Sequence, residues 1–284
     1  MAADCHIHMA LDGGYWKAAL ARHQSAPDEA FIRRTLAKYQ ALGFTYLRDG
    51  GDRWGAGETA SRLAPEYAIR YRMPCFPIYR AGHYGSFIGR GFGTVEEYRA
   101  LVAEVKRRGG HFIKLMISGL MDFDHYGVLT DEPMPVNLIC ELTKIAHDAG
   151  FSVMAHANGD LAVRGAVKAG IDSVEHGAYL TDETLHALAE SGTVWVPTLV
   201  TIGNLLGDTR FPEAVTRPLL RYQMDAVKKA AALGARIAPG SDAGAYRVLH
   251  GQGGLDELAL LRQALGDGAD EILARGLQAI QARF

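Results

Sequence analysis

Short β-rich runs alternate with amphipathic helical patterns along the whole chain, and this alternation constrains the fold more than any other feature of the sequence. The last four runs each follow a glycine that closes the preceding helical pattern, as a helix stop signal does. Strict alternation of β and α segments predicts a parallel sheet whose strands are connected by helices. The predicted strands are residues 5–8, 44–47, 69–79, 111–116, 151–154, 171–174, 193–196 and 235–238.

The segments between these runs carry apolar residues at helical spacing. In residues 136–149 the apolar side chains recur with i, i+3, i+4 and i+7 spacing, and Gly150 ends the pattern. Thr181 precedes Asp182 and Glu183, which is typical of a capped helix start with acidic residues in its first turn. The predicted helices are residues 28–42, 57–66, 94–108, 136–149, 160–169, 181–191, 213–233, 254–265 and 269–283.

The number of repeats favours a barrel over an open sheet. Eight β/α repeats of about 30 residues fill a chain of this length, which indicates an α/β fold of the (β/α)8 TIM-barrel type. The glycines at 55–57 and 89–91 lack the partners of a nucleotide-binding fingerprint, which a doubly wound sheet often carries. No linker or low-complexity tract interrupts the chain, so we expect residues 1–284 to form a single domain.

The composition excludes several classes of protein. A net charge of -2, with basic residues scattered along the chain, argues against nucleic acid as a partner. No apolar stretch of about 18 residues is present, and the N-terminus lacks the basic and apolar regions of a signal peptide. The three separated cysteines fit a reducing compartment. We therefore expect a cytoplasmic protein without a membrane association that binds a small-molecule substrate, and a homo-oligomer is compatible with these features.

Chemically active side chains stand where several of the predicted strands end. Because the C-terminal strand ends of such a barrel face the active site, these side chains are expected to converge. A single histidine in such a position is more often a hydrogen-bonded core residue, but four imidazoles buried together without a ligand would be costly. Two histidines that are two residues apart on a strand share a face and can bind one metal ion. The set comprises His6, His8, Lys114, His156, His176 and Asp242.

Lys114 and Asp242 are the two members of this set with the most specific chemistry. Lys114 interrupts an apolar strand, and a desolvated, uncharged amine can react with carbon dioxide to give a carbamate that bridges two cations. Asp242 lies among small residues, where it could bind a metal ion and take a proton from water as a general base. The alternatives are a salt bridge between the two residues and a helix-capping role for Asp242.

The order and local sequence of these strand ends resemble those of the amidohydrolase superfamily, and most closely those of its prolidase- and imidazolonepropionase-related branch. The resemblance extends from residue 4 to about residue 265, and it rests on the combination of motifs rather than on any one of them. The motifs are Asp4-Cys5-His6-Ile7-His8, Lys114, Ala155-His156-Ala157, Glu175-His176-Gly177 and Gly240-Ser241-Asp242-Ala243-Gly244.

The resemblance implies a binuclear metal centre, usually of zinc. His6 and His8 would hold one ion together with Asp242, and His156 and His176 would hold the other. A carboxylated Lys114 and a hydroxide would bridge the two ions. Imidazole and carboxylate ligands suit zinc on chemical grounds as well, with manganese, iron or cobalt as alternatives. Many relatives carry a small β-sandwich built from both termini, and we expect this chain to lack it, since its first strand begins near residue 4.

Substrate contacts are predicted from loops that follow the strands. His83 and Arg80 follow the third strand, where they could bind a carbonyl or carboxylate group. His250 follows the eighth strand and resembles a histidine of the family's last loop. Tyr126 lies in the long loop 117–135, which has the length of an active-site lid.

The leading hypothesis for function is a metal-dependent hydrolase of a C–N bond in an amide, a dipeptide or a cyclic amide, with Asp242 as general base and acid. Hydrolysis of an ester or lactone is a variant of it. A mononuclear deaminase of the same superfamily is an alternative, although that branch normally lacks the lysine and has a catalytic glutamate. Glu175 is a poor candidate for that glutamate, since strand alternation predicts that it points away from His176. The non-enzymatic alternative is a catalytically silent barrel that binds metal.

Overall fold

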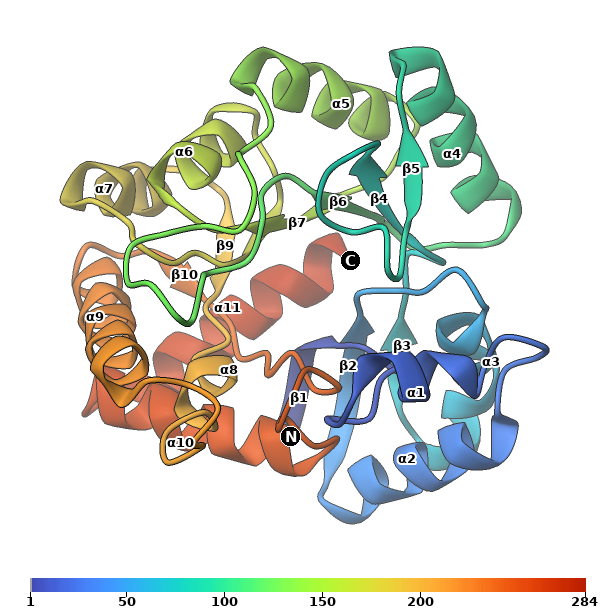
Figure 1. Ribbon diagram of the computed structural model, residues 1–284, viewed down its shortest axis with the longest axis horizontal. Coiled ribbons are helices and arrows are strands. Elements are labelled where there is room, and N and C mark those ends of the chain that lie inside the picture. The colour runs from blue at the N-terminus through green and yellow to red at the C-terminus, as the bar shows by residue number, and fades with distance from the viewer. Residues whose placement is uncertain (1) are drawn as a thin grey trace.

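The structure, a computed structural model, describes residues 2–284 and confirms the predicted α/β fold of the TIM-barrel type. Parallel strands surround the centre, and helices surround the strands (Figure 1). Two sheets form the wall, one in the order β1-β2-β3 and one in the order β10-β9-β8-β7-β6-β4-β5. The strands are β1 (Ala2–Ile7), β2 (Phe44–Asp49), β3 (Arg70–Arg72), β4 (Pro77–Arg80), β5 (Arg90–Phe92), β6 (Ile113–Met116), β7 (Val153–Ala157), β8 (Ser173–His176), β9 (Val194–Val196) and β10 (Arg236–Ile237).

The third predicted strand, residues 69–79, is wrong as a single strand because it is broken in the middle. Its first part, β3, pairs with β2, and its second part, β4, pairs with β6. Pro74 lacks an N–H donor for a ladder, and Cys75 follows it with a left-handed φ of 63°. The same stretch of chain therefore serves both sheets. A third short strand, β5, pairs with β4 and has no counterpart in the sequence prediction.

Backbone hydrogen bonds join β1 to the segment that follows β10. The amide of Cys5 donates to Pro239 O at 2.9 Å, and the amide of Asp242 donates to His6 O at 2.7 Å. The first strand is thus fixed against the last, and residues 6 and 242, far apart in the sequence, become neighbours.

The predicted helices are confirmed with shifts of one or two residues at their ends, and the segment predicted at 57–66 divides into α3 and a 3-10 turn over Ala64–Tyr67. Thr181 caps α7 as expected, since its side chain accepts a hydrogen bond from the amide of Thr184. Two short helices, α1 and α8, were not predicted. The helices are α1 (Trp16–Ala21), α2 (Glu29–Ala41), α3 (Ala56–Leu63), α4 (Val95–Arg107), α5 (Val136–Asp148), α6 (Asp160–Lys168), α7 (Asp182–Glu190), α8 (Val200–Gly203), α9 (Glu213–Ala232), α10 (Gln252–Leu265) and α11 (Ala269–Arg283).

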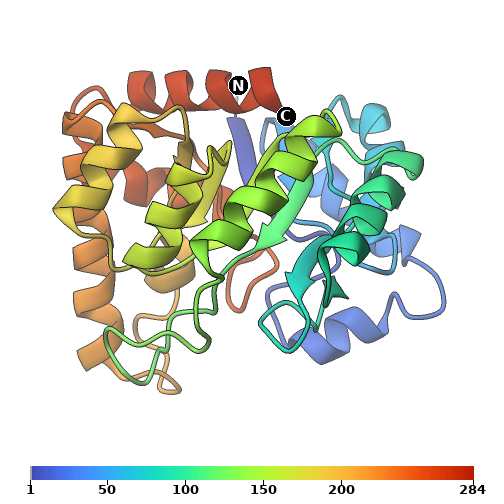
Figure 2. The same cartoon turned by 90° about the horizontal axis from the view of Figure 1, so that it is seen from above.

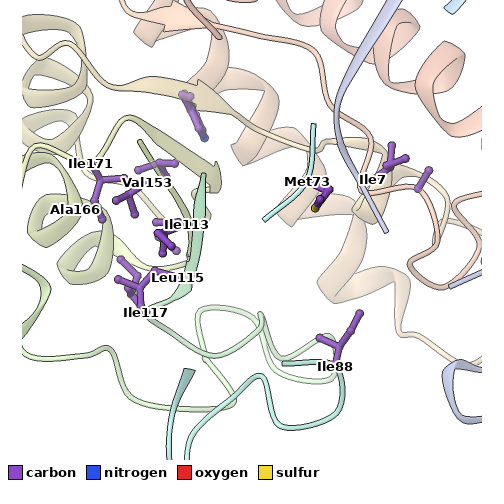
Figure 3. Packing of buried hydrophobic residues seen from close by; sticks show 14 of the residues in the cluster. Ile7, Met73, Ile88, Ile113, Leu115, Ile117, Val153, Ala166 and Ile171 are labelled. Atoms are coloured by element: carbon purple, nitrogen blue, oxygen red, sulfur yellow. The ribbon is translucent and has the colours of Figure 1, made fainter. Parts of the chain in front are cut away.

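Apolar side chains fill two regions of the barrel. The larger cluster lies between the strands and the surrounding helices, where Ile113 and Val153 lie near Ala166 and Ile171 (Figure 3). A smaller cluster contains Cys5 and other strand residues together with the last turn of α11. Among residues 2–284, no helix has both the length and the hydropathy needed to cross a lipid bilayer.

Helix α11 covers one end of the barrel. Figure 2 shows it across the end where both termini lie, with the green loop after β6 at the other end. The ring of Phe284 packs edge-on against that of Phe112, with the two centroids 5.2 Å apart. Because α11 closes this end with apolar contacts, the opposite end, where the strands finish, remains free for a site.

Gly276 lets α11 approach β10 closely, so the Gly276→Ala variant is expected to be less stable. A Cβ atom at this position would lie 1.9 Å from the carbonyl oxygen of Ile237. The helix must therefore move away, and we expect the free energy of unfolding to fall by about 1–3 kcal/mol despite the higher helix propensity of alanine. Urea unfolding measures the change, with the exposed Gln278→Ala as the control. A variant as stable as the parent would contradict the close packing.

The buried Glu257 of α10 bonds to the first residue of α8. We expect this residue to make the stability of the protein depend on pH. Its Oε2 accepts a hydrogen bond from the amide of Val200 at 2.7 Å, and burial raises the pKa of its carboxyl group from 4.5 to about 8. A raised pKa means that the folded state holds a proton that the unfolded state has lost. The stability is therefore complete below pH 4.5 and is lost as the pH rises toward 8.

We expect Glu257→Gln to remove this part of the pH dependence. Glutamine keeps an acceptor for Val200 but carries no charge. The free energy of unfolding of the variant should therefore rise relative to that of the parent by about 1.4 kcal/mol per pH unit between the two pKa values. Urea unfolding of parent and variant at pH 5 and pH 8 measures the difference. An equal gap between the two proteins at both pH values would show that Glu257 does not titrate in this range.

Candidate metal centre

The structure brings the six predicted strand-end residues together at the open end of the barrel. The ring centroids of His6 and His8 lie 5.3 Å apart, those of His6 and His176 5.1 Å, and those of His156 and His176 4.5 Å. Lys114 Nζ lies 3.4 Å from His6 Nε2. Residues from four strands and from the loop after β10 therefore share one small region.

Asp242 completes this cluster from the loop after β10. Its Oδ1 lies 3.3 Å from His8 Nε2 and 3.5 Å from His6 Nε2. His6, His8 and Asp242 each offer one ligand atom, and these three atoms lie within 4.8 Å of one another. This spacing allows all three to bind the same cation.

Two of the six residues adopt backbone angles that are uncommon outside glycine. His176 has a φ of 70° and Asp242 a φ of 59°, and Thr198, which follows β9, has a φ of 50°. Such strained positions tend to persist where the surrounding structure requires a particular side-chain direction, and they cluster at functional sites. Here each one turns the chain at the end of a barrel strand or just after it.

Burial keeps the four imidazoles in the neutral form. Desolvation lowers the pKa of His8 and of His156 to about 3, and it lowers the pKa of His6 and of His176 well below the ordinary value. A neutral imidazole has a free nitrogen lone pair, which is the form that binds metal ions. The hydrogen bond between His176 Nδ1 and Thr198 Oγ1, 2.8 Å long, leaves Nε2 as the ligand atom of that ring.

The alternatives for Lys114 and Asp242 are not observed. Among residues 2–284, no carboxylate oxygen lies within 4.0 Å of Lys114 Nζ, so the residue forms no salt bridge with Asp242. Burial lowers the pKa of the Lys114 amine to about 8 and raises the pKa of the Asp242 carboxyl to about 7. The N-cap residue of the next helix, α10, is Gly251 rather than Asp242. A buried amine and a carboxylate that lines a cavity thus stand beside the imidazoles and do not pair with each other.

These side chains fit a metal centre. Neutral imidazoles and a carboxylate are ligands that zinc and similar divalent ions prefer. His8 Nδ1 is buried and has no hydrogen-bond partner within the described part of the chain. A cation would also compensate the desolvation of Asp242, which no bound positive charge within the described residues neutralises at hydrogen-bond distance.

Glu175 contacts the centre, which corrects the expectation that it points away from it. Its Oε2 lies 3.0 Å from His6 Nδ1, and its Oε1 accepts a hydrogen bond of 2.8 Å from Arg48. The alternation argument was wrong here because the left-handed φ of His176 ends the extended conformation, so both neighbours point to the same side. Glu175 thus stands behind the ring of His6, where a carboxylate commonly lies behind a metal-bound histidine.

Arg48, Glu175 and Thr198 support the site, and the sequence analysis missed these roles. Arg48 is fully buried and also donates to Cys5 O at 2.7 Å and to Ser173 Oγ at 2.8 Å. A signal was present in the sequence, because Arg48 and Glu175 are charged residues that directly follow predicted strands. It was ambiguous, since such a residue can equally face solvent at the rim.

A cavity of about 700 Å³ opens over the candidate metal centre. His8, His176 and Asp242 line it, and the remaining walls are mainly aromatic and aliphatic side chains. The loop 117–135 contributes to these walls through Leu120, Met121 and Phe123, in agreement with its expected position. The volume lies in the range of pockets that hold small organic ligands.

The structure places the four predicted substrate contacts outside the lining of this cavity. His83 binds Asp131 through Nδ1 at 3.1 Å, and Arg80 lies beside the same small depression. Tyr126 is exposed and packs against Tyr179. The buried His250 bonds to the hydroxyl of Tyr39 at 3.2 Å and to Leu11 O at 2.9 Å, so it holds the loop after β1. Position after a strand alone did not distinguish residues that face the cavity from those that support the loops.

Comparison with known proteins relates most of the chain to one family. The model of the amidohydrolase family matches residues 57–279. An uncharacterized protein of Mycobacterium tuberculosis is 34% identical over 183 residues, which is 61% of this chain and 47% of that protein. Ochratoxinase of Aspergillus niger is 27% identical over 281 residues, which covers 84% of this chain and 56% of that enzyme. The chain thus spans about half the length of these curated relatives.

Solved structures share the fold. The crystal structure of A. niger ochratoxinase superposes with a TM-score of 0.78 at 22% identity, covering 98% of this chain and 71% of that one. A Xaa-Pro dipeptidase with methionine bound in its active site gives a TM-score of 0.76 at 20% identity, covering 99% of this chain and 75% of the other.

Proposed function

The chain belongs to the amidohydrolase family, and from this premise we propose that it is a binuclear metal-dependent hydrolase of a C–N bond, related to the prolidase branch. One observation carries the proposal. Four neutral imidazoles, a carboxylate and a buried amine lie together, and no carboxylate of residues 2–284 pairs with the amine. His8, His176 and Asp242 of this set line one cavity. A role in folding alone does not explain this set of buried polar groups.

The ligand assignment is the one that the family resemblance implies, and the positions of the side chains support it. His6, His8 and Asp242 would hold one divalent ion, most simply zinc, and His156 and His176 would hold the second. A carbamate on Lys114 would bridge the two. As an ammonium group Lys114 would repel both cations, whereas its carbamate carries a negative charge and two oxygen ligands. Glu175 and Thr198 orient His6 and His176 from behind.

Bound divalent ions lower the pKa of water and polarise a carbonyl group. Asp242 takes a proton from the attacking water, whose oxygen bonds to the carbonyl carbon of the substrate. The C–N bond then breaks, and Asp242 gives the same proton to the leaving nitrogen. Its position beside His8 in the cavity lining is compatible with both transfers. The same groups would also hydrolyse an ester or lactone.

The geometry favours hydrolysis over deamination by a mononuclear enzyme. A deaminase of this kind requires a glutamate that reaches the substrate. Glu175 instead lies fully buried between His6 and Arg48. It does not line the cavity. The presence of Lys114 in the cluster also supports the binuclear reading.

We expect the Lys114→Ala variant to lose one or both metal ions and most of its activity. The parent protein, reconstituted with zinc, should contain about two equivalents by elemental analysis, because two sets of ligands are available. A screen of dipeptides, N-acyl amino acids, hydantoins and lactones supplies the activity measurement. Lys144→Ala, an exposed lysine on α5, is the matched control. Two equivalents of zinc and full activity in Lys114→Ala would remove the carbamate from the proposal.

A further inference from the structure

Two series of contacting aromatic side chains, here called the aromatic chains, form the cavity walls together with aliphatic residues such as Leu120 and Met121. The first runs from Trp16, in contact with Phe87 at 5.6 Å between centroids, through Tyr84 at 5.7 Å to His156 at 4.9 Å. It therefore leads from the mouth of the cavity to one of the candidate metal ligands. Helix α1, which begins at Trp16, and the loop between β4 and β5 contribute to it.

The second aromatic chain comes from other loops. Phe211 lies 5.7 Å from Phe123 and 6.0 Å from Tyr246, again between ring centroids. These residues belong to the loops after β6, α8 and β10, and all three line the same cavity as the first chain. Aromatic rings from helix α1 and from four loops therefore line this cavity.

Several of these rings are exposed in the free protein. Trp16 is 42% exposed and Tyr246 39% exposed, and Tyr15 beside Trp16 is 62% exposed. Aromatic side chains that stay in water contribute little to folding, and a group of them around one cavity is typical of a ligand-binding surface. Flat apolar groups gain most from such rings, because they can stack on several of them at once.

Arg210 adds a single positive charge to this apolar cavity. It is the one lysine or arginine that the described residues contribute to the lining, and its guanidinium lies 5.1 Å from the ring centroids of both Phe211 and Tyr246. Among residues 2–284 it has no carboxylate partner, since the nearby Asp208 pairs with Arg247 at 2.7 Å. Asp242, the only carboxylate of the lining within the part of the chain that the structure describes, belongs to the candidate metal centre.

From these contacts we infer that the substrate carries a large flat aromatic group and a carboxylate, the first held by the two aromatic chains and the second by Arg210. A guanidinium stacked on two rings is held in place and still presents its N–H fork to a carboxylate. The inference rests on the proposed hydrolase function and assigns a substrate class to its site. A small polar amide would neither contact the aromatic walls of this cavity nor pair with Arg210.

A set of four amides tests the two parts of this inference separately. Glycine is acylated with either an acetyl or a 2-naphthoyl group, and each product is prepared with a free carboxylate and as the carboxamide. We expect 2-naphthoylglycine to have the highest kcat/KM of the four, about 100-fold or more above acetylglycine, because it buries far more apolar area. Equal values for the acetyl and naphthoyl compounds would overturn the role of the aromatic walls.

Arg210→Gln tests the carboxylate site. We expect the ratio of kcat/KM for 2-naphthoylglycine to that for its carboxamide to fall about 10- to 100-fold in this variant, since a hydrogen bond to a charged group is lost. Arg217→Gln, an exposed residue on α9 paired with Glu213, is the matched control and should leave the ratio unchanged. An unchanged ratio in Arg210→Gln would overturn the assignment.

A binding measurement separates this inference from the proposed function. Calorimetric titration of 2-naphthoylglycine into the zinc-loaded protein reports binding whether or not the amide is cleaved. Binding that weakens about 10-fold or more in Arg210→Gln, without hydrolysis of any amide, would support the substrate site and reject the hydrolase proposal. Hydrolysis of acetylglycine with no measurable binding of the naphthoyl compound would support the hydrolase and reject the inference.

Discussion

The Asp242→Asn variant should retain metal but lose about 10²–10⁴-fold in kcat, because it keeps a ligand oxygen and loses the group that carries the proton. Asp242 Oδ1 lies 3.3 Å from His8 Nε2, and the residue lines the cavity where a substrate would bind. An asparagine oxygen can still bind a cation, but an amide accepts no proton at neutral pH. Elemental analysis and steady-state kinetics on the substrate found in the screen measure the two effects.

Asp225→Asn, on the exposed face of α9, is the control for this substitution, and it should change neither metal content nor kcat. An Asp242→Asn protein with unchanged turnover would exclude the proton-transfer role. A protein that loses its metal together with its activity would show instead that Asp242 acts mainly as a ligand.

Removing the charge of Arg48 should give the largest loss of stability. Arg48 and Glu175 form a pair 2.8 Å apart with both side chains fully buried, so Arg48→Met leaves a buried carboxylate without its counter-charge. We expect the free energy of unfolding to fall by about 3–5 kcal/mol, the usual cost of breaking a buried ion pair from one side. Urea unfolding of chelator-treated protein measures it, so that bound metal does not contribute.

The surface pair of Arg164 and Glu183 provides the matched control. Both side chains are largely exposed, and Arg164→Met should cost no more than about 1 kcal/mol. Adding Glu175→Gln to Arg48→Met should restore part of the stability, since it removes the uncompensated charge. A loss below about 1 kcal/mol in Arg48→Met would mean that water or rearrangement replaces the pair.

The order of secondary structure was predictable because it depends on local patterns. The spacing of apolar residues in 136–149 and the glycine after it placed α5 to within one residue. The third strand was less predictable, because Pro74 and Cys75 leave the β-rich character of residues 69–79 intact while they break the ladder. Propensity describes each residue by itself, whereas a ladder needs partners on both sides.

The six candidate metal-binding residues were predictable because a barrel converts position at a strand end into position in space. His156 illustrates this, since the alternation of β7 alone directs it inward beside His176. His250 illustrates the opposite case. It also follows a strand, but a tyrosine from α2 and a carbonyl from the loop after β1 draw its ring away from the cavity.

The sequence by itself determined the alternating elements, the barrel and the strand ends that carry the imidazoles, the amine and the carboxylate, because each follows from periodicity along the chain. Only the tertiary structure decided that Glu175 and Arg48 lie behind His6, that two aromatic chains line the cavity, and that Arg210 has no carboxylate partner among residues 2–284. The physical reason is that these contacts join residues from different loops and strands. Their distances depend on how the whole chain closes, and not on the order of its residues within any one element.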